Sequence, residues 1–165
     1  MRDAAPMPTI DTAMLSPMTE ADLDDVARIE QTLYKHPWTR GNFADALLAG
    51  YAAWVMRADG ELLGYFILMI AVDDGHLLNL SVSTAAQRRG YASLMIVKAC
   101  EVCTGLGASG LLLEVRPSNL TARTLYERRG FTQISVRPGY YPKSDIDATR
   151  VEDALVMRLN LGDQA

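Results

Sequence analysis

The stretch of sequence that decides the fold runs from His76 to Ser93 and reads HLLNLSVSTAAQRRGYAS. Its first half is apolar and rich in residues that favour β-strands, and its middle is a basic turn that contains a glycine. Its last residues open an apolar helix that ends near Gly105. The sequence therefore predicts a strand, a tight loop and a helix start. Because the N-terminus of a helix carries unpaired N–H groups and a partial positive charge, a phosphate group fits there.

The residues of the turn itself are consistent with such a site. Gly90 can adopt a positive φ and lets a ligand approach the backbone closely, and Ala92 is small. Arg88 and Arg89 add positive charge. The alternative is an ordinary strand-to-helix connection with solvated arginines, and the residue types of the turn leave both interpretations open.

The sequence QRRGYA at 87–92 resembles the Q/R-x-x-G-x-G/A loop of the GCN5-related N-acetyltransferases. In that family the loop binds the pyrophosphate of coenzyme A. The resemblance covers most of the chain and is greatest to the RimI-type ribosomal-protein-alanine N-acetyltransferases. The other segments that carry it are HPW at 36–38, LNLSV at 78–82, LEVRPSN at 113–119, LYE at 125–127, GF at 130–131, YYP at 140–142 and EDA at 152–154.

Length and composition predict one folded domain. The 165 residues with 49% hydrophobic content can bury a sizeable core. Residues 1–15 lack an apolar period and are expected to be a loose tail, which leaves a single domain at 16–162. The apolar run at 65–72 is too short to span a bilayer, so we expect a soluble cytoplasmic protein with no membrane partner. A net charge of −4 argues against direct binding of nucleic acid.

Two motifs in the chain imitate functional sites. Cys100 and Cys103 form a C-x-x-C, but they lie inside the predicted helix at 92–105 without a second pair, so we expect core residues and no metal site. The sequence GLGASG at 105–110 matches the G-x-G-x-x-G pattern of dinucleotide-binding proteins. It leaves a helix and enters a strand, which is the reverse of the dinucleotide context, and it predicts a helix end and a turn.

Periodicity and capping residues predict an α+β (mixed α/β) fold. The resemblance implies the order ααβββαβαββ, with a mostly antiparallel twisted sheet of about six to seven strands and about four helices. The expected helices are 20–33, a short one capped by Thr39, 92–105 and one capped by Ser118 or Asn119. The expected strands are 51–58, 61–72, 76–83, 111–116, 131–136 and 151–159, with a two-residue hairpin turn at Asp59-Gly60 and a turn at 73–75.

The resemblance assigns two catalytic roles. Glu114 corresponds to the proton acceptor, and because it lies in an apolar strand we expect burial to raise its pKa. The alternative is a structural ion pair with Arg116, two residues along on the same face of the strand. Tyr126 corresponds to the proton donor to the coenzyme A thiolate, and the alternative is a core tyrosine.

The resemblance also assigns the binding of acetyl-CoA. The backbone of the strand at 80–82 is expected to pair with the pantetheine arm, and the N–H of Val82 to polarise the thioester carbonyl. The residues implied in cofactor binding are Leu80, Ser81, Val82, Arg88, Arg89, Gly90, Tyr91, Ala92, Ser93 and Asn119.

Three aromatic residues are candidates for the acceptor groove. Trp38 is implied as one wall, and its alternative role is a core anchor. Tyr140 and Tyr141 are implied beside the groove, and their alternative role is a cross-strand aromatic pair that stabilises a hairpin by stacking. Glu152 and Asp153 follow as a solvated strand start.

The implied activity is transfer of acetyl from acetyl-CoA to the N-terminal alanine of small-subunit ribosomal protein eighteen, by direct attack in a ternary complex. The expected partner is therefore a protein N-terminus, and the chain is expected to act as a monomer or weak dimer. The alternatives are an acetyltransferase for other protein N-termini or a small amine, and a module that senses acetyl-CoA without turnover.

Overall fold

The computed structural model describes residues 13–142 and 151–162. Its strands form one sheet in the order β1-β2-β3-β4-β5-β7-β6. The strands are β1 (Met14–Pro17), β2 (Ala52–Ala58), β3 (Glu61–Ile70), β4 (Asp74–Val82), β5 (Gly110–Val115), β6 (Thr132–Tyr141) and β7 (Glu152–Asn160). The helices are α1 (Leu23–Leu33), α2 (Arg40–Leu48), α3 (Tyr91–Gly105) and α4 (Leu120–Arg128), with short 3-10 turns at Glu20–Asp22 and Thr84–Ala86.

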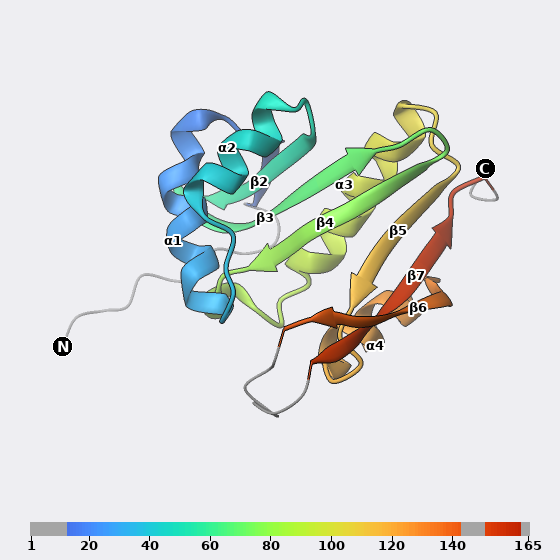
Figure 1. The fold of residues 1–165 in the computed structure, drawn as a ribbon. Helices are drawn as coiled ribbons and strands as arrows, with labels where there is room; N and C mark the ends of the chain where they lie inside the picture. The colour runs from blue at the N-terminus through green and yellow to red at the C-terminus, as the bar shows by residue number, and fades with distance from the viewer. Residues whose placement is uncertain (1–12, 143–150, 163–165) are drawn as a thin grey trace.

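The predicted mixed fold with a mostly antiparallel sheet is confirmed. Neighbouring strands are antiparallel except for β4 and β5, which are parallel. Helices α1 and α2 cover one face of the sheet over β2 and β3, whereas α3 and α4 lie on the opposite face (Figure 1). Each face has its own apolar core, because both faces of the central strands are covered.

Capping and turn residues predicted most of the helices and turns correctly. Thr39 caps α2 by accepting a hydrogen bond from the N–H of Asn42. Asp59 and Gly60 both have positive φ, at 52° and 81°, and make the tight turn between β2 and β3. The turn predicted at 73–75 lies earlier in the chain, between the end of β3 at Ile70 and the start of β4 at Asp74.

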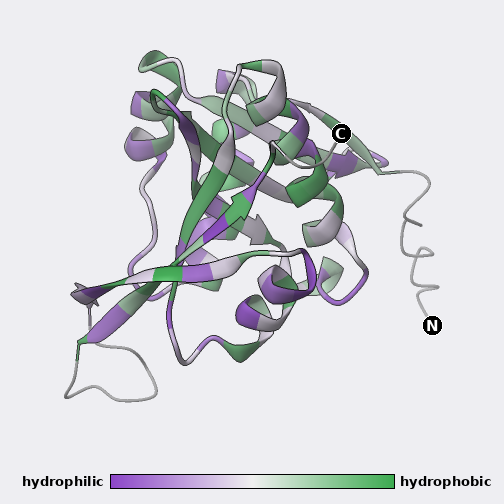
Figure 2. Cartoon of the chain, turned by 90° about the vertical axis from the view of Figure 1, so that its right-hand side faces the viewer, coloured by the Kyte–Doolittle hydropathy of each residue, from purple (hydrophilic) through white to green (hydrophobic). Residues whose placement is uncertain are grey.

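The two edge strands differ from the sequence prediction. Met14 and Leu15 pair with β2 as part of β1, so the prediction of a loose tail is wrong for these two residues. Residues 1–12 lie outside the described residues. Strand β6 continues to Tyr141 instead of ending at 136, and it is exposed along its length except for the half-buried Tyr141. The β6–β7 hairpin mixes hydrophilic and hydrophobic residues (Figure 2), and the alternation of Ile134 and Val136 with polar residues does not continue through Pro138 and Gly139.

Strands β4 and β5 pair along only part of their length. The parallel pairing runs from Asp74–Gly110 to Leu77–Leu113 and stops there. Beyond Leu77, β4 stays paired with β3, and β5 stays paired with β7. The two strands therefore diverge in the middle of the sheet (Figure 1). This divergence positions the site described below.

The cysteines of the C-x-x-C motif lie on α3 as free thiols. Cys103 is fully buried and packs so closely on β4 that a Cβ at Gly75 would collide with its Sγ. Burial raises the pKa of the Cys103 thiol to about 12 and also raises that of Cys100. Within 13–142 and 151–162, no group of three His, Cys, Asp or Glu residues is arranged to hold a metal ion. None of the helices in these ranges is long and apolar enough to cross a membrane.

Candidate active site

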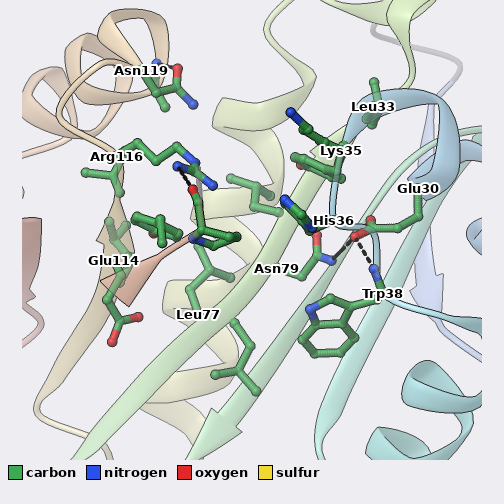
Figure 3. Close-up of a pocket in the computed structure, with 18 of the residues that line it drawn as sticks. Glu30, Leu33, Lys35, His36, Trp38, Leu77, Asn79, Glu114, Arg116 and Asn119 are labelled. Carbon is green, nitrogen blue, oxygen red and sulfur yellow. Dashed lines mark hydrogen bonds between the residues drawn. The ribbon is translucent and has the colours of Figure 1, made fainter. Parts of the chain in front are cut away.

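A cavity of about 450 Å³ opens where β4 and β5 diverge. Glu114 and Arg116 lie on one side of it, and Glu30, His36 and Trp38 on the other (Figure 3). The cavity is lined by Glu30, Leu33, Tyr34, Lys35, His36, Trp38, Leu77, Leu78, Asn79, Leu80, Leu113, Glu114, Val115, Arg116, Asn119, Ala122, Tyr126, Tyr141 and Pro142. The structure thus brings together six of the residues singled out in the sequence: Trp38, Leu80, Glu114, Asn119, Tyr126 and Tyr141.

One wall of the cavity rests on a buried carboxylate that the sequence analysis missed. Glu30 of α1 is only 2% exposed. Its oxygens accept hydrogen bonds from the Tyr65 hydroxyl at 2.5 Å, from Asn79 Nδ2 at 3.2 Å and from the backbone N–H of Trp38 at 3.2 Å. Glu30 therefore ties the segment after α1 to β3 and β4 and fixes one side of the cavity.

Trp38 packs against the core and also lines the cavity. Its ring lies 5.1 Å from the Phe43 ring between centroids, so it packs against the core formed by α1 and α2. The same residue lines the cavity. A rigid aromatic held by the core makes a fixed wall.

Replacing Glu30 by alanine is expected to lower the free energy of unfolding by about 1–3 kcal/mol, because the buried Tyr65 hydroxyl and Asn79 amide lose their acceptor. Loss of the Trp38 anchor is expected to raise KM for the acceptor as well. Chemical denaturation and steady-state kinetics measure the two effects. Glu127→Ala, at an exposed position of α4, is the control. Equal stability of the two variants would show that Glu30 does not anchor this wall.

Glu114 projects from β5 between two partners. Its Oε2 lies 2.5 Å from Nε2 of His76, and its Oε1 accepts a hydrogen bond from Arg137 at 3.1 Å. The alternative of an ion pair with Arg116 is wrong. Arg116 instead lies 3.5 Å from Glu152, donates to the Pro142 carbonyl at 3.1 Å and covers the Tyr141 ring.

The expected rise in the pKa of Glu114 is also wrong. Burial alone would raise this pKa, but the hydrogen bond and charge of His76 outweigh it together with those of Arg137. The pKa of Glu114 is therefore lowered from its ordinary value, and the side chain is a carboxylate at neutral pH.

Tyr126 projects from α4 into the same cavity. It is 9% exposed, and its ring lies 5.6 Å from that of Phe131. No hydrogen bond joins its hydroxyl to any residue in the described part of the chain. Burial raises its pKa, and the nearby Tyr34 and Tyr141 add to the effect. The hydroxyl therefore keeps its proton and is available as a donor.

The two tyrosines near the end of β6 have different surroundings. Between the pairs Arg137–Ala154 and Tyr141–Glu152, β6 carries two more residues than β7, and this bulge contains Gly139 with a φ of 60°. Tyr141 lines the cavity under Arg116, whereas Tyr140 lies outside it beneath Arg137. Their rings are stacked edge to face at 5.0 Å, but both residues belong to β6, so the pair does not span two strands.

The far part of β4 offers an unpaired backbone edge to the cavity. The N–H of Ser83 donates to the carbonyl of Leu63, which precedes Gly64 of β3, so the backbone groups of Ser83 face β3. Because successive residues of a strand direct their backbone groups to alternate edges, those of Leu80 and Val82 face the edge away from β3. The Val82 carbonyl accepts a hydrogen bond from Gln87 Nε2 at 3.1 Å. Ser81 is paired with Tyr65 of β3, and its buried side chain donates to Asn79, so Ser81 offers neither its backbone nor its side chain to this edge.

The loop after β4 has the conformation that its glycine predicted. Gly90 is the N-cap of α3 with a φ of 87°, and Arg88 also has a positive φ of 62°. Arg88, Arg89 and Gly90 are exposed, and Ala92 and Ser93 are half-buried in the first turn of α3. The Tyr91 ring is buried in the core, so only its backbone can face a ligand.

The sequence model of the acetyltransferase (GNAT) family matches residues 23–131. The chain belongs to this acetyltransferase family. It is 33% identical to the [ribosomal protein bS18]-alanine N-acetyltransferase of Haemophilus ducreyi, over 90% of this chain and 100% of that one. It is 30% identical to the enzyme of that name from Escherichia coli, over 88% and 95% of the two chains.

Solved structures of acetyltransferases agree with this assignment. The ribosomal-protein-S18-alanine N-acetyltransferase from Escherichia coli superposes with a TM-score of 0.82 at 28% identity, covering 93% of this chain and 98% of that one. NAA60 from Arabidopsis thaliana in complex with acetyl-CoA gives a TM-score of 0.77 at 20% identity, covering 90% and 98%, which shows the shared fold.

The features of this acetyltransferase fit acetyl-CoA, which supplies the acetyl group as a thioester. The N-terminus of α3 with Arg88 and Arg89 suits the pyrophosphate. The unpaired edge of β4 suits the amide groups of the pantetheine arm, and that edge leads into the cavity beside Glu114 and Tyr126.

Replacing Gly90 by valine is expected to weaken acetyl-CoA binding at least tenfold, because a branched side chain at a positive φ distorts the loop and covers its N–H groups. Isothermal titration calorimetry measures the affinity. Gly107→Val is a matched control, since Gly107 also has a positive φ, at 83°, but lies beyond the other end of α3. Equal affinities of the two variants would refute the phosphate site.

Proposed function

We propose that this acetyltransferase transfers acetyl from acetyl-CoA to the α-amino group of the N-terminal alanine of ribosomal protein bS18, by direct attack in a ternary complex. The observation that carries the proposal is that Glu114 and Tyr126 line one cavity, at the point where the unpaired edge of β4 reaches it. The names of the most similar relatives support the choice of acceptor.

Glu114 is suited to accept a proton from the attacking amine, and Tyr126 is suited to donate one to the departing sulfur. An α-ammonium group has a pKa of about 7.7–8.0, so it must lose a proton before it attacks the thioester carbonyl. The Glu114 carboxylate attracts the ammonium and accepts that proton. As the C–S bond breaks, the Tyr126 hydroxyl gives its proton to the departing sulfur and is reprotonated by the proton that the new amide nitrogen loses. The products are the acetylated N-terminus, coenzyme A and one released proton.

The walls of the cavity suit the first residue of a protein chain. Trp38 and Tyr141 come from opposite sides, one from the segment before α2 and the other from the end of β6. Two rigid rings favour a small side chain such as alanine over a bulky one. A ribosomal acceptor supports a cytoplasmic location for the reaction.

Mass spectrometry of a peptide with the N-terminal sequence of bS18 tests this proposal. Incubation with acetyl-CoA is expected to add one acetyl group at the N-terminal alanine. The same peptide with its N-terminus already blocked, and a small polyamine, are expected to remain unmodified. Acetylation of a lysine side chain or of the polyamine, with no change at the N-terminal alanine, would contradict the proposal.

A further inference from the structure

A chain of hydrogen bonds runs from the buried Glu30 to the surface of the cavity. Asn79 donates from its Nδ2 to both Glu30 oxygens at 3.2 Å (Figure 3). Ser81 Oγ donates to Asn79 Oδ1 at 2.7 Å, and the Tyr34 hydroxyl lies 2.6 Å from Ser81 Oγ. Glu30 and Ser81 are each 2% exposed, whereas Tyr34 is 43% exposed and lines the cavity. The chain therefore joins a buried carboxylate to a phenol that a ligand can reach.

The direction of each hydrogen bond in this chain follows from Glu30. A carboxylate only accepts, so Asn79 presents its NH₂ group to Glu30 and its carbonyl oxygen to Ser81. The Ser81 hydroxyl has one proton and donates it to Asn79, so in the contact with Tyr34 it is the acceptor. The Tyr34 proton is therefore directed at Ser81, and the lone pairs of the Tyr34 oxygen remain for a ligand. In the described part of the chain, Ser81 is the only hydrogen-bond partner of this hydroxyl.

Tyr34 lies close to the groups that carry out the reaction. It is the C-cap of α1, and its neighbours Leu33 and Lys35 lie on the side of the cavity opposite Glu114 (Figure 3). Tyr34 is also near enough to Tyr126 to contribute to the raised pKa of that phenol. The Tyr34 oxygen therefore faces the space between the two residues that act on the acceptor and on the sulfur.

An amine that attacks a thioester has to keep its nitrogen lone pair free for the new C–N bond. A hydroxyl that donated its proton to the nitrogen would occupy that lone pair. A hydroxyl that accepts an N–H instead holds the amine and leaves the lone pair free to attack. An α-ammonium group has three N–H donors, and under the proposed function Glu114 takes only one of their protons. The amine that forms still has N–H groups for a second acceptor.

We propose that Tyr34 positions the attacking amine, because its hydroxyl oxygen accepts an N–H from the N-terminus of the acceptor; this inference rests on the proposed function. Glu114 takes a proton from the ammonium on one wall, and Tyr34 holds a remaining N–H from the other. Tyr34 exchanges no proton with the substrate. The buried chain that begins at Glu30 keeps the Tyr34 proton directed at Ser81 and away from the amine.

Tyr34→Phe tests the contact, because phenylalanine keeps the ring and removes the hydroxyl. With the bS18 peptide as the acceptor, kcat/KM is expected to fall about tenfold or more, chiefly through a higher KM for the peptide, and acetyl-CoA affinity is expected to stay unchanged. Tyr51→Phe is the matched control, since Tyr51 is a half-buried tyrosine that lies outside the cavity. This control is expected to keep the wild-type kcat/KM.

Ser81→Ala tests the direction of the chain. It removes the acceptor of the Tyr34 proton, so that the hydroxyl can turn this proton towards the amine nitrogen. The value of kcat/KM is expected to fall at least as far as in Tyr34→Phe, although Tyr34 itself is intact. The double variant is expected to match Tyr34→Phe, because Ser81 acts on the reaction only through the Tyr34 hydroxyl. Melting temperature and acetyl-CoA affinity establish that each variant is folded.

The outcomes separate this inference from the proposed function. A wild-type kcat/KM in Tyr34→Phe, with the wild type active on the bS18 peptide, would overturn the role of Tyr34 alone. Losses that add in the double variant would also overturn it, since Ser81 would then act independently of the Tyr34 hydroxyl. An equal loss in Tyr51→Phe would do the same. An inactive wild-type protein on the bS18 peptide would overturn the proposed function itself.

Discussion

Replacing Glu114 by glutamine is expected to slow acetyl transfer to an alanine-first peptide by about 10²–10⁴-fold and to leave acetyl-CoA affinity unchanged. Glutamine has nearly the same shape but neither accepts the ammonium proton nor carries the charge that attracts it. It also removes the ion pair with Arg137 and changes the short contact with His76. Steady-state kinetics and calorimetry on the wild type and the variant measure both quantities.

The pH dependence of the Glu114 variant follows from the direction of the pKa shift. Because the folded pKa lies below the ordinary value of 4.5, the contacts of the Glu114 carboxylate with His76 and Arg137 stabilise the protein above that pH. This stability is lost as the pH falls through the lowered folded pKa. The stability difference between wild type and Glu114→Gln is therefore expected at neutral pH and is expected to vanish in acid. Protonation of Glu114 produces no acidic limb of the rate profile above pH 4.5.

A near-normal rate in Glu114→Gln, combined with a lower melting temperature, would contradict the catalytic role. The carboxylate would then be structural, and the base would be another group at the cavity. Glu152 is not suited to replace it, because its oxygens already interact with Arg116 and accept a hydrogen bond from the Ser118 hydroxyl at 2.8 Å. Glu127→Gln, on the exposed face of α4, is the matched control for loss of one carboxylate.

Replacing Tyr126 by phenylalanine is expected to slow transfer by about 10²-fold with little change in affinity for either substrate. The fold is expected to keep its stability, since phenylalanine preserves the packing on Phe131 and the hydroxyl has no hydrogen-bond partner within the described ranges. Because the pKa of Tyr126 is raised above 10, its ionisation produces no alkaline limb below that pH, and the variant is expected to keep the shape of the wild-type profile there.

Single-turnover kinetics separate the chemical step from binding and release in this variant. Tyr140→Phe is the control, because Tyr140 lies beside Tyr141 but outside the cavity. An unchanged rate of the chemical step in Tyr126→Phe would mean that the thiolate obtains its proton from water, and that Tyr126 is a core residue.

The helices and tight turns could be predicted because their signals are local. The Asp59-Gly60 pair and the Thr39 cap depend on residues close together in the chain. The edge strands could not be predicted in this way. Strand β1 has only four residues, and β6 is exposed and contains Pro138 and bulges, so both take their conformation from pairing with a neighbouring strand. The loop at 142–150 falls, from residue 143 on, outside the described residues.

In the candidate site, too, some features have local sequence signals and others depend on strand pairing. Glu114 was noticeable as a carboxylate in an apolar strand, but its partners His76 and Arg137 lie 38 and 23 residues away, and only the strand register brings them to it. Within the predicted strand at 111–116, Arg116 was the only basic residue that could pair with Glu114. The position of Glu30 does have a local sequence signal. Glu30 follows Leu23, Val26 and Ala27 at helical spacing, so it lies on the apolar face of α1. A carboxylate at such a position has to find buried donors.

Mass spectrometry of all protein N-termini in cells with and without this protein tests the central claim most directly. We predict that the N-terminal alanine of bS18 is acetylated when the protein is present and unmodified when it is absent, with the great majority of other N-termini unchanged. Identical acetylation of bS18 in both cell populations would contradict the proposed function.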